Sequence, residues 1–393
     1  MKVFVQLSIF FIILYQPIFA CRLWAVCTKS NRSFSNLSDL EKSYLINGLD
    51  AYYDQSNSMP NGWSLLLYED STQSNLEPLY RSNSPASNDS SIYWETVDAI
   101  IQSESGKLAL GHLRLATTGA NNIPNPHPWM FHDSINSFSL IHNGTINKEI
   151  LKNLITEYGQ DQSWLIEHQP QTFDNGDWQN GGWDYVVDSE LLLLYVMKKI
   201  YELDNTLDGL KIALGNIINN GVSINQLNII FSDGYSLYVF GKSNGLYIAE
   251  SDEYFTVMTI PPNNRLSTAL SWSGINYGEM IVINSAGKTH YANINDSNIV
   301  LPSIIGITLE PSYPNPFNGA VTIPFSMDDN ATGIISIFSL KGERISRITL
   351  SSSDIANGYI KWNPNNSTIA SGAYYIFAES NGLTDYNKIL FIK

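Results

Sequence analysis

The sequence contains few charged residues and almost none of the cysteine that metal or disulfide scaffolds require. Of its 393 residues 15% are charged, and only Cys21 and Cys27 are cysteines. Two cysteines near one end exclude a disulfide-based miniature fold and a four-cysteine zinc site. Lys and Arg together number 22 against 37 Asp and Glu, which gives a formal net charge of -15. Nucleic acid is therefore not an expected partner, because its phosphates attract basic surfaces.

Long hydrophobic runs are also missing after the first twenty residues. The chain starts with Lys at position 2, continues through an apolar run over residues 3–15, and reaches Pro17 and Ala20. This pattern predicts a secretory signal peptide over residues 1–20 that is cleaved after Ala20. The apolar run is shorter than the roughly 20 residues of a membrane-spanning helix. We therefore expect no transmembrane segment in the mature chain.

Cleavage at this site would make Cys21 the first residue of the mature protein. Its free α-amino group would have a pKa of about 7.7–8.0 and could accept the proton of its own thiol. Two other interpretations fit the same residues. The stretch from Ile18 to Cys21 partly resembles a lipoprotein cleavage box, in which Cys21 is acylated and anchored. An oxidising compartment would also allow a Cys21–Cys27 disulfide.

Hydrophobic periodicity divides the mature chain into two parts. The first part, residues 21–292, contains segments with helical periodicity and segments with strand periodicity, which predicts a layered α+β domain. Its expected strands are 21–28, 62–68, 108–115, 138–146 and several runs from 227 onward, and its expected helices are 35–55, 93–104, 147–158 and 188–203. Residues 159–184 are rich in Trp, Gln, Asn and Gly without a period, which predicts an insertion or lid-like loop.

The second part begins after a linker predicted at residues 293–307, where Asn, Ser and Pro interrupt the apolar residues. Residues 308–393 consist of short alternating strands separated by regular turn signals. This pattern predicts a small all-β sandwich without helices.

Four short motifs in the first part contain the residue types that catalysis requires. They are Cys21 with Arg-Leu-Trp, GHLRLATTG at 111–119, NPHPW at 125–129 with HNGTI at 142–146, and VVDSELL at 186–192. Each motif alone also has a structural interpretation. Arg114 could pair with a buried acid, Asn143-Gly144 is a common turn, and Asp188 could cap a helix. The histidines of these motifs are more typical of side chains that anchor turns than of metal ligands, because no ligand spacing relates them.

Taken together and in this order, the motifs resemble the glutaminase domain of class II glutamine amidotransferases, the N-terminal cysteine hydrolases. That family begins its mature chain with Cys and then carries Arg-x-Ala-Thr, His-Pro, His-Asn-Gly and Asp-Ser/Thr-Glu. The resemblance covers about residues 21–290. It implies a four-layer αββα N-terminal nucleophile hydrolase fold over residues 21–292, with no cofactor and no metal.

The resemblance also implies a role for each motif residue. Cys21 would attack the amide carbon of a glutamine-like small molecule and form a thioester. The side-chain amide of Asn143 and the backbone N–H of Gly144 would stabilise the oxyanion.

Three further residues would bind the substrate. Arg114, assisted by Thr117, would hold the α-carboxylate by a charge-assisted hydrogen bond. Asp188 would hold the α-ammonium group. Opposite charges at the two ends of the pocket match a zwitterionic amino acid.

The chain departs from the family pattern in three respects. It begins with an export signal, it has a long stretch between Gly144 and Asp188, and it carries no synthase or isomerase domain to accept ammonia. We therefore expect a secreted amidohydrolase that releases ammonia from glutamine or a related γ-glutamyl or small amide. The alternatives are an acylase or another C–N hydrolase of the same fold, and an inactive surface-anchored binding protein.

The C-terminal part resembles the sorting domain of type IX secretion substrates. The segment PSYPNPFNGAVTIPFSM and the terminal KILFIK carry this resemblance. It implies that the type IX secretion machinery is a partner and that the protein is secreted or displayed at the surface of a Gram-negative bacterium. An ordinary adhesion or carbohydrate-binding sandwich is the alternative.

Overall fold

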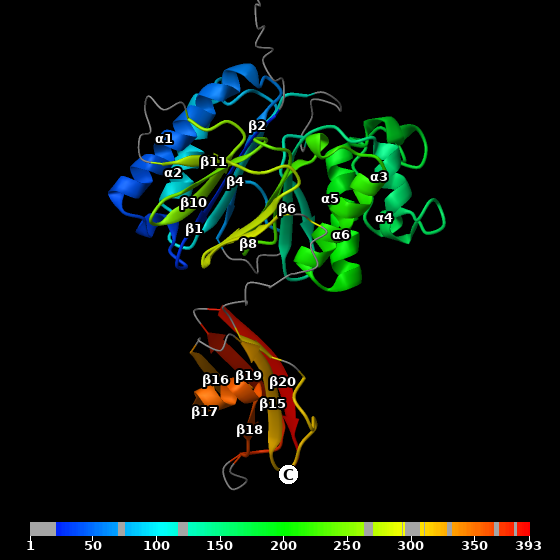
Figure 1. The fold of residues 1–393 in the computed structure, drawn as a ribbon. Coiled ribbons are helices and arrows are strands. Elements are labelled where there is room, and N and C mark those ends of the chain that lie inside the picture. The colour runs from blue at the N-terminus through cyan, green and yellow to red at the C-terminus, as the bar shows by residue number, and fades with distance from the viewer. Residues whose placement is uncertain are drawn as a thin grey trace, which may run out of the picture. The chain divides into compact units, whose positions relative to one another are not determined.

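The chain forms two compact units, Met1–Asn295 and Asp296–Lys393 (Figure 1). The computed structural model describes residues 21–69, 75–116, 125–262, 270–292, 294, 307–309, 311–327, 332–364, 369–380 and 383–393. The predicted signal peptide and the predicted site residue Thr117 lie outside these described residues.

The first unit contains a seven-stranded sheet in the order β11-β9-β10-β1-β4-β2-β3. Its strands are β1 (Arg22–Thr28), β2 (Trp63–Tyr68), β3 (Tyr80–Ser82), β4 (Leu108–Leu113), β9 (Tyr247–Glu250), β10 (Tyr254–Met258) and β11 (Trp272–Gly274). Every residue of β1, β2 and β4 is buried, so this part of the sheet is covered on both faces.

Alternate side chains of β1 explain how the two faces are covered. Trp24 and Val26 pack with the helices α1 (Asp39–Gln55) and α2 (Ser90–Ile101). Leu23, Ala25 and Cys27 point to the opposite face, because successive side chains of a strand alternate. There they pack against a second sheet.

This second sheet has six strands in the order β13-β12-β8-β7-β6-β5. The strands are β5 (Trp129–His132), β6 (Ser137–Asn143), β7 (Asn228–Ser232), β8 (Ser236–Phe240), β12 (Met280–Asn284) and β13 (Gly287–Tyr291). Ile141, Ile230 and Leu237 of this sheet share one apolar core with the inward side chains of β1. Figure 1 shows α5 (Asp188–Leu203) and α6 (Thr206–Asn219) beside β6.

The first unit is therefore a mixed helix-and-sheet domain, as predicted. The helix expected at 188–203 coincides with α5, and the helix expected at 147–158 is α3 (Lys148–Ile155). No element was predicted over 204–226, where α6 and the 3-10 turn η4 (Ile224–Gln226) lie. The insertion at 159–184 contains the short helix α4 (Ser163–Glu167), and the 3-10 turn η3 (Gly181–Tyr185) begins near its end.

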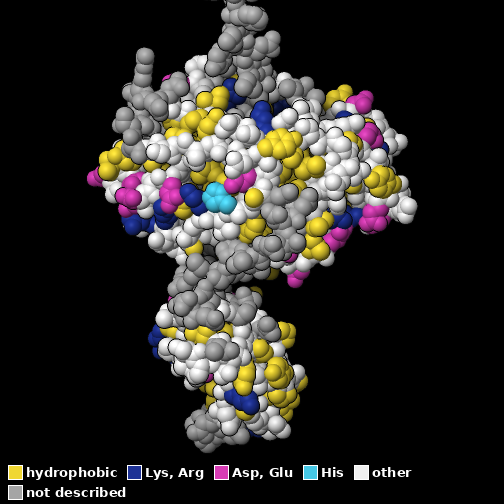
Figure 2. Space-filling model, viewed as in Figure 1, with side chains coloured by type: hydrophobic (Ala, Val, Ile, Leu, Met, Phe, Trp, Pro, Cys, Tyr) yellow, Lys and Arg dark blue, Asp and Glu magenta, His cyan; other side chains and the backbone are white. Residues whose placement is uncertain are grey.

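Charged side chains on the first unit form small mixed clusters. Glu250 lies 2.7 Å from both Lys29 and Lys288, and Arg32 lies 2.5 Å from Glu253. Figure 2 shows Lys and Arg interspersed with Asp and Glu over the visible face. Such exposed pairs contribute at most about 1 kcal/mol each.

The second unit contains two small sheets with a common core. One has the order β14-β15-β18 and the other β17-β16-β19-β20. The strands are β14 (Ile307–Leu309), β15 (Val321–Met327), β16 (Gly333–Ser339), β17 (Arg344–Thr349), β18 (Tyr359–Trp362), β19 (Gly372–Ser380) and β20 (Leu383–Phe391). Ile323 from one sheet and Ile335, Ile337 and Ile376 from the other belong to the same apolar cluster.

The prediction that this unit lacks helices is wrong. The short helix α7 (Ser352–Asn357) follows β17. Ser351 and Asp354 form a capping box at its start, and Gly358 ends it with a φ of 69°. These local hydrogen bonds satisfy the backbone groups at both ends, which explains how a polar segment of six residues forms a helix. Among the described residues of both units, no helix combines the length and the apolar character needed to cross a membrane.

Candidate active site

Cys21 and Arg114 lie at the same end of the seven-stranded sheet. Strands β1 and β4 are antiparallel with Arg22 opposite Leu113, so the residue before β1 is next to the residue after β4. The Sγ atom of Cys21 lies 3.4 Å from the backbone nitrogen of Leu115 and 3.5 Å from its carbonyl oxygen. Arg114 is only 5% exposed. The register thus places the predicted nucleophile beside the predicted carboxylate-binding residue.

The surroundings of Cys21 keep its thiol protonated. Burial raises the pKa of the Cys21 thiol, and this effect outweighs the lowering by the Leu115 backbone and by the Arg114 and Arg22 guanidinium groups. A thiol in this state needs a nearby base before it can act as a nucleophile. Cys27 is a core residue that is only 2% exposed, and burial raises the pKa of its thiol to about 12. It is therefore not a candidate nucleophile. The two cysteines form no disulfide with each other.

The predicted oxyanion residues occupy a tight turn at the end of β6. Asn143 is the last residue of β6 and pairs with Asn228 of β7, whose Nδ2 donates to the Asn143 carbonyl at 3.2 Å. A Cβ atom on Gly144 would lie 2.0 Å from the carbonyl oxygen of Gln226. Glycine is therefore required at this position by the close approach of a second segment of backbone.

Asp188 faces the same turn from the first residue of α5. Its Oδ2 accepts the backbone N–H of Ile146 at 2.7 Å, and its Oδ1 accepts that of Ser189 at 3.0 Å. The residue is 8% exposed. Asp188 therefore does not cap α5, because the N-cap residue is Val187 and no side chain caps this helix. Its carboxylate instead ties the start of α5 to the segment after Gly144.

Three buried histidines connect these two groups of residues. The rings of His112 in β4 and His127 stack with centroids 4.2 Å apart. The backbone N–H of His127 donates to Nδ1 of His112, and that of His142 donates to Nδ1 of His127, each at 3.2 Å. His112 lies opposite Leu23 of β1, and His142 directly precedes Asn143. His112, His127 and His142, which we call the histidine bridge, therefore hold the ends of β4 and β6 together.

The hydrogen bonds of the bridge also determine the protonation of the rings. Burial lowers the pKa of all three histidines, so their rings are neutral. In His112 and His127 the Nδ1 atom accepts a backbone N–H, so the ring proton is on Nε2. In His142 the Nε2 atom lies 2.8 Å from the Gln226 carbonyl, which can only accept. Within the described part of the chain, no group of three or more His, Cys, Asp or Glu residues is placed to hold a metal ion.

Two residues of this arrangement were not predicted to belong to the site. Ser189 Oγ lies 2.9 Å from His142 Nδ1, and Gln226 contacts the Asn143–Gly144 turn from the end of η4. Ser189 is part of a predicted motif but received no role. Gln226 lies in a stretch for which we predicted no element. Only the packing of η4 against β6 shows its proximity.

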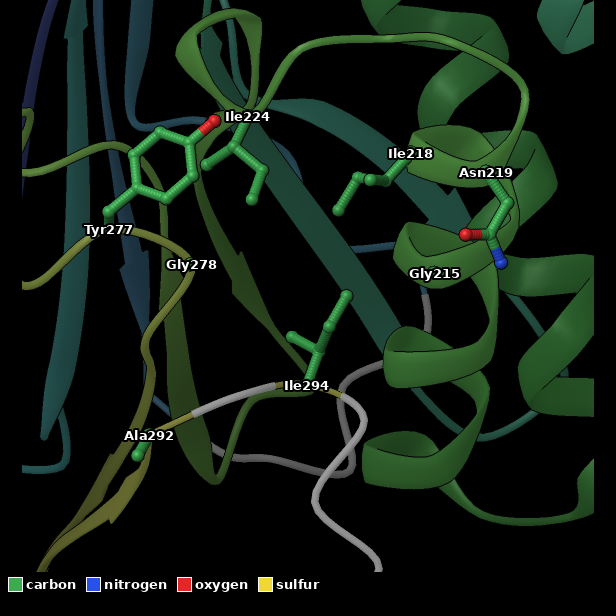
Figure 3. Close-up of a pocket in the computed structure, with 8 residues that line it drawn as sticks. All are labelled: Gly215, Ile218, Asn219, Ile224, Tyr277, Gly278, Ala292 and Ile294. Carbon is green, nitrogen blue, oxygen red and sulfur yellow. The ribbon is translucent and has the colours of Figure 1, made fainter.

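The cavity in Figure 3 is separate from this site. It has a volume of about 280 Å³. Its lining consists of Gly215, Ile218, Asn219, Ile224, Tyr277, Gly278, Ala292 and Ile294. None of these lining residues is a predicted site residue, although Ile224 belongs to the same 3-10 turn as Gln226.

Comparison with known proteins gives a match for each unit. Residues 312–393 match the family of the secretion system C-terminal sorting domain. A segment of 165 residues is 27% identical to a probable glutamine–fructose-6-phosphate aminotransferase (isomerizing) of Acanthamoeba polyphaga mimivirus. That match covers 38% of this chain and 26% of the relative, so the chain spans about a quarter of the length of the curated relative that it matches.

Two of the solved structures that are similar to the chain are glutamine amidotransferases. The glutamine phosphoribosylpyrophosphate amidotransferase of B. subtilis has 16% identity and a TM-score of 0.42, with 69% of this chain and 49% of that chain covered. A predicted glutamine amidotransferase of Pseudomonas aeruginosa has 13% identity and a TM-score of 0.34, with 68% and 98% covered.

Both resemblances noted in the sequence are confirmed, the first by the relative and the second by the matched family. The sorting domain indicates export to the cell surface or secretion.

Proposed function

We propose that residues 21–292 form an exported N-terminal cysteine amidohydrolase that releases ammonia from glutamine or a related γ-glutamyl or small amide. The observation that carries this proposal is the position of the Cys21 thiol beside Arg114, with the Asn143–Gly144 turn connected to them by the histidine bridge. The similarity to the mimivirus aminotransferase supports the same class of chemistry.

The proposed reaction begins with removal of residues 1–20. The α-amine of Cys21 then takes the thiol proton, because the thiolate and not the thiol is the nucleophile. The sulfur attacks the amide carbon, and the negative charge that develops on the amide oxygen is stabilised by Asn143 Nδ2 and the Gly144 N–H. The C–N bond breaks as the nitrogen takes the proton and leaves as ammonia. Water then attacks the thioester, and its C–S bond breaks to release the acid and regenerate the thiol.

The proposed substrate site uses charges at two ends. Arg114 would bind the α-carboxylate, with Thr117 as a second donor, and Asp188 would bind the α-ammonium group. Burial favours this role for Arg114, because a guanidinium that is 5% exposed forms a stronger bond to a carboxylate than one in water. Asp188 already accepts two backbone N–H groups, and a carboxylate retains further acceptor positions for a ligand.

The proposed function also implies a fold for residues 21–292 and a role for each remaining segment of the chain. The helices α1 and α2, the two sheets, and the helices α5 and α6 would be the four layers of an αββα hydrolase. Residues 1–20 would be the leader for the inner membrane, residues 293–307 a linker, and residues 308–393 a β-sandwich recognised by the type IX secretion machinery.

Replacement of Cys21 tests the proposal. Purified mature protein should release ammonia from glutamine or a related amide, and Cys21→Ala should abolish this release while the circular dichroism spectrum stays unchanged. The matched control is Cys27→Ala, which removes a core thiol far from the chemistry and should keep the turnover. A Cys21→Ala protein with full turnover would contradict the proposal.

The intact mass of the mature N-terminus separates the remaining alternatives. A chain that begins with unmodified Cys21 supports catalysis, whereas a diacylglyceryl group on Cys21 identifies an anchored protein without the free amine. Turnover of acyl amides that lack an α-carboxylate, in preference to glutamine, would identify an acylase.

A further inference from the structure

Gln226 contacts the Asn143–Gly144 turn through both its backbone and its side chain. Its carbonyl oxygen accepts the Nε2–H of His142 at 2.8 Å. Its side-chain Oε1 accepts the backbone N–H of Thr145 at 2.9 Å. The two hydrogen bonds therefore hold the residue before Asn143 and the residue after Gly144.

The same carbonyl also limits how the turn can move. A Cβ on Gly144 would lie 2.0 Å from the Gln226 oxygen and 2.6 Å from its carbonyl carbon. Gly144 is thus packed directly against the Gln226 peptide group. A shift of the turn toward η4 would produce a clash, and a shift away would break both hydrogen bonds.

His142 is fixed on its other side by α5. Because its Nε2 carries the ring proton, its Nδ1 accepts the hydroxyl proton of Ser189 at 2.9 Å. The imidazole therefore connects the Gln226 carbonyl to α5 through two directed bonds. His142 is 1% exposed, so water has little access to its ring nitrogens.

We propose that Gln226 is a positioning residue that keeps the Asn143 amide and the Gly144 N–H directed at the reacting amide oxygen. This inference rests on the proposed function, because it assigns the turn to the oxyanion. Donors that are fixed in advance stabilise a transition state more than donors that must first be ordered. The side chain of Gln226 would contribute to kcat without touching the substrate.

A pair of substitutions at Gln226 separates its hydrogen bond from its size. Gln226→Met keeps the length of the side chain and removes the Oε1 acceptor, while the carbonyl bond to His142 remains. It should lower kcat about fivefold to twentyfold and change KM less than about twofold, since the interaction acts on the transition state. Asn225→Ala is the matched control, because Asn225 is an exposed neighbour in the same turn, and it should leave both constants unchanged.

Hydrogen exchange provides a readout that does not depend on turnover. Thr145 is exposed, so its amide proton exchanges slowly only while it is hydrogen-bonded. Exchange of this amide, followed by mass spectrometry of a peptide over residues 142–147, should be about tenfold faster in Gln226→Met than in the wild type. Gln226→Glu keeps an acceptor oxygen and should retain slow exchange. Its added charge would itself oppose an oxyanion, so it is compared by exchange alone.

The two proposals fail in different ways. If the wild type releases no ammonia from any amide, the proposed function fails, whatever the exchange rates are. If the wild type is active but Gln226→Met keeps its kcat, or if the Thr145 amide exchanges at the wild-type rate in this variant, the positioning role of Gln226 is overturned.

Discussion

The Sγ atom of Cys21 contacts both polar backbone atoms of Leu115, the nitrogen at 3.4 Å and the carbonyl oxygen at 3.5 Å, although the two residues are 94 positions apart in the sequence. The nitrogen can donate to the sulfur and the oxygen can accept from the thiol. The backbone after β4 can therefore form a hydrogen bond with the sulfur both as a thiol and as a thiolate. This contact fixes the sulfur beside Arg114. Mutation of the residues around the sulfur therefore tests the proposed function most directly.

Gly144→Ala should remove most of the activity. The new Cβ would lie 2.0 Å from the Gln226 carbonyl and 2.8 Å from Nε2 of His142, so the turn must move. Loss of a correctly placed oxyanion donor lowers kcat by about 100-fold to 1000-fold, and steady-state kinetics measures this. The control is Gly48→Ala in α1, where a Cβ meets no atom within 4 Å, and where the helix should gain up to about 1 kcal/mol. A Gly144→Ala protein with near wild-type kcat would exclude this turn from the oxyanion site.

Arg114→Gln should chiefly raise KM for amino-acid amides. A hydrogen bond to a charged group contributes about 1.5–3 kcal/mol, which corresponds to a KM increase of about 10-fold to 100-fold. Acyl amides without an α-carboxylate should be affected much less, and Arg114→Lys should give an intermediate KM because lysine keeps the charge and loses the planar fork. An equal increase in KM for both classes of amide would show that Arg114 does not bind the α-carboxylate.

The stability of the first unit should depend on pH through Glu190. Burial raises the pKa of this carboxyl from its ordinary 4.5 to about 8, although two backbone contacts from Gln171 at 3.0 Å favour the charged form. Between these two pH values the folded protein retains a proton that the unfolded chain has lost. Stability therefore falls as pH rises from about 4.5 to 8.

Thermal unfolding of Glu190→Gln tests this dependence. The variant should lose less in Tm between pH 5 and pH 8 than the wild type, because its side chain does not titrate. The control is Glu95→Gln, an exposed residue of α2, whose Tm should follow the wild type at every pH. Parallel curves for Glu190→Gln and the wild type would contradict the assignment.

Trp183 should anchor the end of the insertion to α3. Its ring centroid lies 4.6 Å from Nζ of Lys152 and 5.1 Å from that of Lys148, and its Nε1 donates to Glu149 at 2.5 Å. Trp183→Ala should therefore cost about 1–2 kcal/mol and accelerate limited proteolysis of residues 168–186. Tyr185→Ala, a neighbour that is 40% exposed, serves as the control and should be cleaved at the wild-type rate. Equal cleavage of the two variants would mean that other contacts anchor the segment.

The strongest predictions from the sequence concern long, regularly patterned elements. The helix at 188–203 and the buried strands β1, β2 and β4 were found within a few residues of the predicted limits, because their apolar residues repeat with the period of one secondary structure. Shorter or weakly patterned elements were missed, and α6 and α7 are two examples. No element was predicted where α6 lies, and the second unit was expected to lack helices although Ser351 and Asp354 carry the local signal for capping α7.

The sequence by itself determined which residues can perform chemistry, their order along the chain, and the family that they resemble, because side-chain chemistry and short motifs are local properties. Only the tertiary structure decided which of them meet. The antiparallel register of β1 and β4 brings Cys21 to Arg114, the histidine bridge joins β4 to β6, and η4 places Gln226 against Gly144. These contacts depend on how distant segments pack around a shared core, and no spacing within one segment encodes that packing.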